Sequence, residues 1–512
     1  MISSQQLYSL VRDNPGRTVH ELCAILDHEF HKSELNSRLY APWTPFEWKP
    51  GRGNERRWYI ADHGKHRDVT SVERLELYPW QLEALEWWRA HRSRGVVEAV
   101  TGAGKTRLAL AAIAEQLDAG GPVVILVPTT ELIHQWAREV ENWLRTDLGL
   151  EFSIGILGNG RDDVERKPDV LITTVQSAFN HYLLPGRTEG LIVADEVHHY
   201  GAPRWSKALE PVFAQRLGLT GTYEREDSGL EEFLDPYFGN NLFEVDYERA
   251  LEEDVIAHFK IAYVGVEFSP KEAEEHADSS DKAYRYRQKL INGHGLPEEP
   301  FGEFIKHTHI LSQGGNGEAT GLARGYLHAF SKCRQVLAGA EAKFDRVADL
   351  SGAIKKADKS IIFAQTNDAA SEAIVRLGDK GLSGEVLDSS MDMHDRKRVF
   401  AEFEREPNAI VAAPRLLDEG IDVPDADLAI VLASNRSRRQ LVQRLGRVIR
   451  KKDDRRLARL AVLYVIGTIE DPELGANQDF MYLVENVADD IKYFGPSTSS
   501  SRICSYLNDW SA

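Results

Sequence analysis

A glycine-rich loop between an apolar strand and an apolar helix constrains this chain more than any other feature. Residues 101–106 read Thr-Gly-Ala-Gly-Lys-Thr, after the mostly apolar residues 96–100 and before the apolar segment 108–113. Gly102 and Gly104 let consecutive backbone N–H groups point into one concavity at a helix N-terminus, which attracts phosphate oxygens. A plain turn is the alternative for an isolated Gly-x-Gly, but the flanking strand and helix favour a phosphate loop.

The loop and a later strand end together predict an ATP-hydrolysing site. Lys105 suits the β and γ phosphates, and Thr106 suits Mg²⁺. The apolar residues 191–194 run into Asp195 and Glu196, at the strand end where parallel α/β sheets place their ligands. Asp195 is expected to hold Mg²⁺ and Glu196 to orient or deprotonate the attacking water. A solvated strand end is the alternative, but the upstream loop favours catalysis. The predicted nucleotide-binding residues of the loop are Thr101, Gly102, Ala103, Gly104, Lys105 and Thr106.

Composition sets the broad class of the chain. Its 512 residues suit three or four domains of ~150 residues. The net charge of −18 argues against coating of nucleic acid by bulk attraction, so local basic tracts must make such contacts. Cys23, Cys333 and Cys504 lie far apart, which predicts no disulfide framework or metal site and favours the cytoplasm. No secretion signal or membrane-spanning segment is expected.

Alternating strand and helix patterns predict two doubly wound α/β units separated by a helical insertion. His198 is expected to face the second unit, which has no phosphate loop of its own. The predicted segments are an accessory domain, a first α/β domain, a helical insertion, a second α/β domain and a helical tail, at 1–68, 69–250, 251–342, 343–475 and 476–512.

The accessory domain has a winged-helix pattern. Three short helices are expected before two strands, at 46–48 and 56–60, around a turn. Lys49 and Arg52 on this hairpin are placed to meet a nucleic-acid backbone. Protein contact is the alternative role for such a module.

Other candidate nucleic-acid contacts lie at strand ends and in the insertion. Thr129, Thr174 and Gln176 follow apolar strands, where hydroxyl groups can face phosphate; helix capping is the alternative. Arg285 and Arg287 belong to a tract that interleaves basic and aromatic residues, which suits phosphate contact and base stacking. A helix with packed tyrosines and solvated cations is the alternative for that tract.

The second unit contributes a basic helix over residues 440–450. Arg444, Arg447 and Arg450 are spaced three residues apart and share one face of that helix. Such guanidinium groups can reach across a cleft to a transferring phosphate. A solvated basic face is the alternative.

These motifs together resemble those of superfamily-two helicases and translocases. Residues 99–106, 195–198, 220–222, 418–422 and 440–450 resemble motifs I, II, III, V and VI, in family order. Arg225, in the segment Arg-Glu-Asp, resembles an element of the XPB-like, DEVH-box branch. The resemblance implies two tandem RecA-like domains and ATP-driven 3′–5′ movement on DNA.

The resemblance also implies roles for single residues. Gln81 would contact adenine, Arg447 and Arg450 would be arginine fingers, and Gly420 and Asp422 would lie near ribose and metal. The chain departs from the family pattern at Tyr78 and Gly221, where arginine and alanine are common, and its N-terminal module differs from that of XPB proteins.

Two functional classes remain open from the sequence. One is an ATP-dependent DNA helicase or duplex translocase in repair, recombination or phage defence. The other is a DNA-stimulated ATPase subunit of a nuclease or defence complex that does not itself unwind DNA. RNA as the track is a weaker third option.

Overall fold

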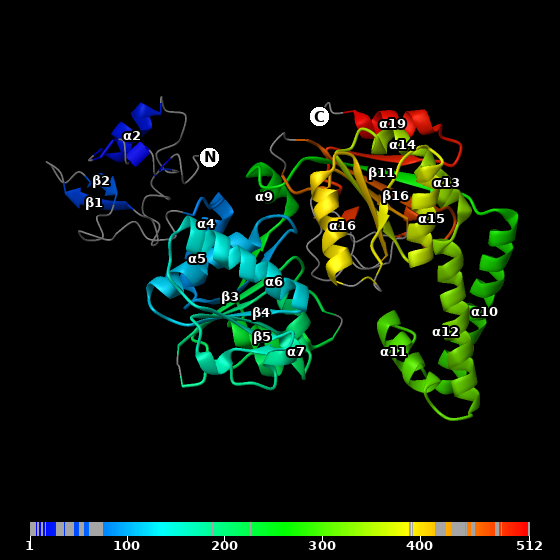
Figure 1. The fold of residues 1–512 in the computed structure, drawn as a ribbon, viewed down its shortest axis with the longest axis horizontal. Helices are drawn as coiled ribbons and strands as arrows, with labels where there is room; N and C mark the ends of the chain where they lie inside the picture. The colour runs from blue at the N-terminus through cyan, green and yellow to red at the C-terminus, as the bar shows by residue number, and fades with distance from the viewer. Residues whose placement is uncertain are drawn as a thin grey trace.

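A computed structural model of the chain shows two α/β lobes, a helical insertion and parts of the N-terminal segment (Figure 1). In the described part of the chain, no helix combines the length and apolar character that crossing a bilayer requires. The described residues are 7, 10, 11, 14, 15, 17–26, 35, 46–50, 56–60, 75–186, 189–225, 227–388, 391, 393–414, 426–432, 446, 448–451, 456–476, 481, 482 and 484–509.

The first lobe is built on an eight-stranded sheet in the order β10-β3-β9-β8-β4-β7-β5-β6. All neighbouring strands are parallel except β5 and β6. Alternate residues of the central strands enter two different apolar cores, so both faces of the sheet are covered. The strands are β3 (Arg94–Ala99), β4 (Val123–Val127), β5 (Ile154–Gly158), β6 (Arg161–Asp162), β7 (Val170–Thr174), β8 (Leu191–Ala194), β9 (Gln215–Thr220) and β10 (Leu242–Val245).

Several helices of the first lobe begin shortly after a strand ends, as alternating β and α patterns predict. The phosphate loop leads from β3 directly into α5, and β4 leads into α6, which continues as a π-helical segment at Val140–Asp147. The helices are α4 (Pro79–Ala90), α5 (Lys105–Asp118), α6 (Thr130–Glu139), α7 (Val175–Ala178), α8 (Asp235–Phe238) and α9 (Tyr247–Glu252).

The second lobe carries a seven-stranded sheet in the order β13-β14-β12-β15-β16-β11-β17, with every neighbouring pair parallel. The fold class predicted from sequence, two doubly wound parallel-sheet domains, is confirmed. The strands are β11 (Phe259–Val266), β12 (Lys359–Ala364), β13 (Glu385–Val386), β14 (Ala409–Pro414), β15 (Leu428–Val431), β16 (Ala458–Val465) and β17 (Asp490–Phe494). Helices of this lobe are α13 (Glu341–Asp349), α14 (Ser351–Ile354), α15 (Asn367–Gly378), α16 (Met393–Arg405) and α19 (Ser500–Asn508).

Two strands of this sheet correct the division made from sequence. β11 belongs to the second sheet, where it pairs with β16 over its whole length, although the sequence places it in the helical insertion. β17 pairs with β11, although the sequence places it in a helical tail. Their pairing partners lie far away along the chain, and a short apolar run does not distinguish a buried strand from a buried helix.

The helical insertion leaves the second lobe between β11 and α13 as three helices (Figure 1). α10 (Pro270–His294) and α12 (Glu318–Ala338) run antiparallel, and α11 (Phe301–Ser312) packs beside α12 around a separate apolar core. At its base the backbone N–H of Glu341 donates to Oε1 of Glu272 at 2.9 Å. The insertion is therefore joined to the lobe at both of its ends.

The N-terminal segment contains the predicted hairpin. β1 (Phe46–Pro50) pairs antiparallel with β2 (Arg56–Ile60), and a helix, α2, spans Val19–Ile25. Lys49 lies on β1, whereas Arg52 lies outside the described residues. The winged-helix interpretation stays a prediction.

Candidate nucleotide site between two lobes

The phosphate loop forms a concave backbone at the end of β3. Gly102 and Gly104 have φ angles of +89° and +87°, which glycine adopts without strain. A Cβ atom at Gly104 would lie only 2.8 Å from Nε2 of Gln81. Nζ of Lys105 donates to the carbonyl of Ala99 at 2.7 Å, so the ammonium group is held beside the loop.

Gln81, which the resemblance assigns to adenine, is fully buried beneath this loop. Its Nε2 donates to the carbonyl of Gly104 at 2.8 Å, and its Oε1 accepts from the N–H of Tyr78 at 2.8 Å. The side chain therefore fastens the start of α4 to the loop. Its contact with adenine stays a prediction.

Asp195 follows β8 and is held by two hydrogen bonds. Nε1 of Trp136 donates to Oδ2 at 2.8 Å, and the N–H of Glu196 donates to Oδ1 at 3.0 Å. Burial raises the pKa of Asp195 above its ordinary value, while the Trp136 hydrogen bond and the charge of Lys105 act in the opposite direction. The carboxylate is thus fixed in orientation and lies within the field of the loop lysine.

Glu196 has a left-handed backbone conformation, with φ of +48° and ψ of +52°. This conformation is unfavourable for residues other than glycine, and it recurs at functional sites. Its carboxylate lies 3.6 Å from Nδ1 of His198. The sequence led us to expect that His198 would face the second lobe, but the structure places it elsewhere. It is buried in the first lobe, and its Nδ1 is hydrogen-bonded to Oγ1 of Thr220 at 2.9 Å. The carboxylate motif is thereby linked to the end of β9.

Gly446 and Arg450 bring the second lobe to the phosphate loop. The backbone of Gly446 packs so closely on Thr101 that a Cβ atom there would collide with the threonine side chain. A Cβ atom at Gly102 would lie 3.2 Å from Cγ of Arg450 and 3.3 Å from the carbonyl oxygen of Gly446. The structure therefore unites the loop, the carboxylate motif and one predicted arginine finger. Three other predicted residues, Arg447, Gly420 and Asp422, lie outside the described residues.

The donor set fits a nucleoside triphosphate with magnesium. Glycines in left-handed conformations, a helix N-terminus and Lys105 suit phosphate oxygens, and the Thr106 hydroxyl and Asp195 carboxylate suit a hard cation. Among the described residues, no group of three or more His, Cys, Asp or Glu side chains could hold a metal.

Two of the three predicted nucleic-acid residues near strand ends cap helices in this structure. Oγ1 of Thr129 accepts from the N–H of Leu132 at 3.4 Å, and Oγ1 of Thr174 accepts from the N–H of Ser177 at 3.2 Å. Gln176 is exposed on α7. Contacts of these three residues with nucleic acid stay predictions.

Arg225 holds the loop after β9 against the carboxylate motif. Its guanidinium donates to both carboxylate oxygens of Asp227, at 2.6 and 2.7 Å, and to the carbonyl of His198. The hydrogen bonds from Arg225 lower the pKa of Asp227 below its ordinary value. The residue therefore has a structural role whether or not it also contacts nucleic acid.

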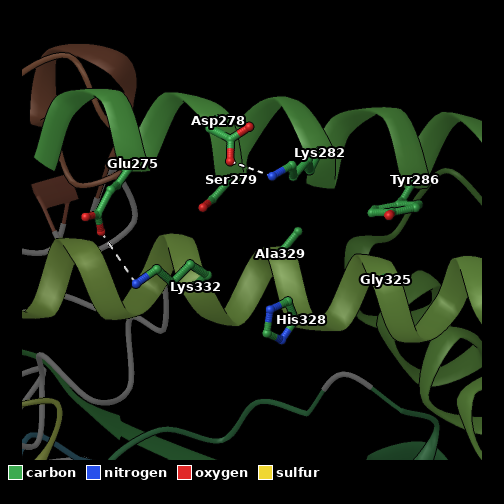
Figure 2. Close-up of a pocket in the computed structure, with 9 residues that line it drawn as sticks. All are labelled: Glu275, Asp278, Ser279, Lys282, Tyr286, Gly325, His328, Ala329 and Lys332. Carbon is green, nitrogen blue, oxygen red and sulfur yellow. Dashed lines mark hydrogen bonds and ion pairs between the residues drawn. The ribbon is translucent and has the colours of Figure 1, made fainter. Parts of the chain in front are cut away.

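A groove separates α10 from α12 in the helical insertion (Figure 2). Ion pairs line it, with Glu275 and Lys332 3.5 Å apart and Asp278 and Lys282 2.6 Å apart. The Tyr286 ring packs against α12. The charges of this groove are thus partly matched within the insertion.

The two predicted cations of the insertion differ in their surroundings. Arg287 lies over the rings of Phe301 and Phe304 and donates to the carbonyl of Glu298 at 2.7 Å, so it packs within the insertion. Arg285 is exposed on α10. Only for Arg285 does the side chain remain available at the surface for the predicted contact.

Two aromatic residues that the sequence did not assign to the site contact Asp195. Trp136 bonds the carboxylate, and Oη of Tyr200 lies 2.5 Å from the carbonyl oxygen of Asp195. A buried tryptophan or tyrosine usually needs a polar partner for its N–H or O–H. That rule marks Trp136 as a residue with a partner, but does not identify the partner.

Two family models match the chain. "Type III restriction enzyme, res subunit" matches residues 74–225, and "Helicase conserved C-terminal domain" matches residues 342–452. A similar relative is the "DNA 3'-5' translocase XPB2" of Sulfurisphaera tokodaii, which is 28% identical over 74% of this chain and 80% of its own length. The two family models fall on the two lobes that form the site, one on each lobe.

Solved structures share the fold. The structure titled "S. cerevisiae Dbp5 bound to RNA and ADP BeF3" has a TM-score of 0.54 and 13% identity, over 86% of this chain and 95% of that one. The "ATP-dependent Type ISP restriction-modification enzyme LlaBIII bound to DNA" has a TM-score of 0.52 and 18% identity, over 90% of this chain and 34% of that one.

Proposed function

We propose, on the premise that this chain belongs to the superfamily-two helicases, that it couples ATP hydrolysis to 3′–5′ movement along DNA and to opening of the duplex. The observation that carries the proposal is the contact of Gly446 and Arg450 with the phosphate loop. One lobe binds the triphosphate and the other supplies a cation, so hydrolysis changes the contact between the lobes.

The residues divide the chemistry among them. The loop N–H groups and Lys105 bind the phosphates, and Glu196 orients the attacking water. Arg450 of the second lobe, together with Arg447, neutralises charge that develops on the transferring phosphate. Thr106 and Asp195 would hold magnesium, which when bound neutralises phosphate charge and orients the nucleotide.

DNA is the proposed track, and the carboxyl edge of the first sheet is its proposed path in that lobe. Thr174 ends β7 at this edge, Gln176 lies on α7, and Thr129 and Arg225 follow β4 and β9. The named DNA translocase among the relatives supports DNA over RNA for this chain.

A second candidate is a DNA-stimulated motor subunit that serves a separate nuclease. The match to a restriction-enzyme family model and the likeness to a restriction-modification enzyme favour it. In that case hydrolysis drives translocation without strand separation by the chain alone.

The test measures ATP hydrolysis in parallel with single-stranded DNA, duplex DNA and RNA, and then strand separation on a duplex with a 3′ or 5′ tail. We expect stimulation by DNA and separation only from the 3′-tailed duplex. DNA stimulation without separation would favour the motor subunit. Absence of nucleic-acid-stimulated hydrolysis would contradict both candidates.

We also propose a cytoplasmic location. Cys23, Cys333 and Cys504 lie far apart in the sequence and predict no disulfide framework, which suits a reducing compartment. Fractionation of cells that produce the full chain tests this proposal.

A further inference from the structure

We propose that the indole N–H of Trp136 positions the Asp195 carboxylate for magnesium. Helix α6, which carries Trp136, would then contribute directly to the geometry of the ATP site. The inference rests on the proposed function. Trp136 is a positioning residue in this scheme, because it acts through Asp195 and touches no reacting atom.

The first support is the geometry of the carboxylate. Nε1 of Trp136 lies 2.8 Å from Oδ2 of Asp195, and the Glu196 N–H occupies Oδ1 at 3.0 Å. One donor on each oxygen fixes the carboxylate plane but leaves each oxygen further lone pairs for a cation. Rotation of the carboxylate would break the indole bond, so the tryptophan selects one orientation.

The second support is the rigidity of the anchor. Only 2% of Trp136 is exposed, and its ring packs in the main apolar core of the first lobe. The backbone of Asp195 is also held, because its N–H donates to the carbonyl of Leu126 on the neighbouring strand β4 at 2.9 Å. A donor held this firmly can impose its position on a partner.

The third support is what else α6 contacts. The helix begins after Thr129, at the edge proposed to face DNA, and Glu131 in its first turn lies 3.9 Å from Arg396 of the second lobe. Asp195 contacts the same helix near its other end. A shift of α6 caused by DNA or by movement of the second lobe would therefore move the donor to Oδ2.

The test variant is Trp136→Phe, which keeps an aromatic ring and removes the N–H. Its matched control is Trp88→Phe, because Trp88 is equally buried in the same core and its Nε1 donates to the carbonyl of Arg216, outside the site, at 2.9 Å. The primary readout is nucleotide affinity of the DNA-free protein, measured with a fluorescent ATP analogue in magnesium and in EDTA. The ratio of the two affinities isolates the contribution of magnesium.

We expect Trp136→Phe to reduce this ratio at least fivefold while affinity in EDTA stays within twofold of the unaltered chain. We also expect kcat with saturating DNA to fall at least tenfold, and KM for ATP in magnesium to rise in step with the lost affinity. Trp88→Phe should leave the magnesium ratio unchanged even if it lowers the unfolding temperature. An unchanged ratio in Trp136→Phe would overturn the proposal.

A second variant covers poor folding of Trp136→Phe. Benzothienylalanine at position 136 has the shape of tryptophan but carries sulfur in place of the N–H group. It should reproduce the lost magnesium ratio, and an unaltered ratio would again overturn the proposal. Failure of the proposed function is separate, because it would appear as absent DNA stimulation in the unaltered chain, whereas the magnesium ratio is measured without DNA.

Discussion

Both lobes bury charge, but they use it differently. In the second lobe, Lys343 and Glu470 form an ion pair at 2.7 Å with side-chain exposures of 0% and 4%, and Arg459 pairs with Asp427 equally deep in the lobe. In the first lobe, the half-buried Asp195 is held by N–H donors of an indole and the backbone. The paired charges are matched within the chain, whereas Asp195 keeps lone pairs for a ligand.

The paired charges of the second lobe join segments that are distant in sequence. Lys343 lies on α13 and also donates to the carbonyl of Leu337 at 2.9 Å, where the helical insertion returns to the lobe. Its partner Glu470 follows β16. The pair therefore connects the base of the insertion to the sheet, and its effect should appear in stability rather than in chemistry.

The largest expected effect breaks the chemical side of the comparison. Lys105→Ala and Glu196→Gln should each reduce turnover by about 10³-fold or more, since phosphoryl-transfer sites depend on positioned charge and an oriented water. Steady-state ATP hydrolysis with DNA measures the loss. Lys306→Ala, which alters an exposed pair in the helical insertion, is the control for removal of a lysine. Rates near those of the unaltered chain in either site variant would refute the assignment of the site.

The next effect tests the structural side. Lys343→Met should lower the free energy of unfolding of the second lobe by about 3–5 kcal/mol, because it leaves Glu470 buried without its cation. The double variant Lys343→Met with Glu470→Leu should regain most of that loss. Calorimetric unfolding of all three proteins measures the difference. Equal losses in the single and double variants would show that packing, and not charge, decides stability here.

The sequence predicted the parts of this comparison that local motifs carry. The loop at 101–106 and Asp195 with Glu196 were readable because residue type, spacing and neighbouring strands all agree with one chemistry. The Trp136 hydrogen bond was not readable, since its partner lies 59 residues away and only the order of β4 and β8 in the sheet brings them together. The same limit hid β11 and β17.

The second sheet shows why long-range pairing escapes sequence analysis. In the sequence, Arg459 and Asp427 look like ordinary surface charges, because the residues next to each of them do not indicate an ion pair. A charge within an apolar strand is informative only once its partner is known. Placement of β16 beside β15 supplies that partner.

The smallest expected effect sharpens the comparison within the first lobe, because Asp163 is buried there but paired. Its carboxylate accepts from the N–H of Ile156 at 3.1 Å and contacts Arg161 at 2.9 Å and Arg166 at 2.8 Å. The backbone hydrogen bond and these cations lower the pKa of Asp163, in contrast to the raised pKa of Asp195. Asp163→Asn should therefore cost about 1–2 kcal/mol of stability at pH 7.

The pH dependence of that cost separates charge from shape. A carboxyl group whose pKa is lower in the folded state adds stability above its unfolded pKa of ~3.9, and the contribution disappears as pH falls through the folded value. The difference between Asp163→Asn and the unaltered chain should therefore shrink in acid. Urea unfolding at pH 7, 5 and 4, and at the lowest pH where the chain stays folded, measures this trend. A stability difference that persists at the lowest pH would mean that Asp163 acts through hydrogen-bond geometry and not through its charge. In that case the charge of Asp163 would not explain how it differs from Asp195.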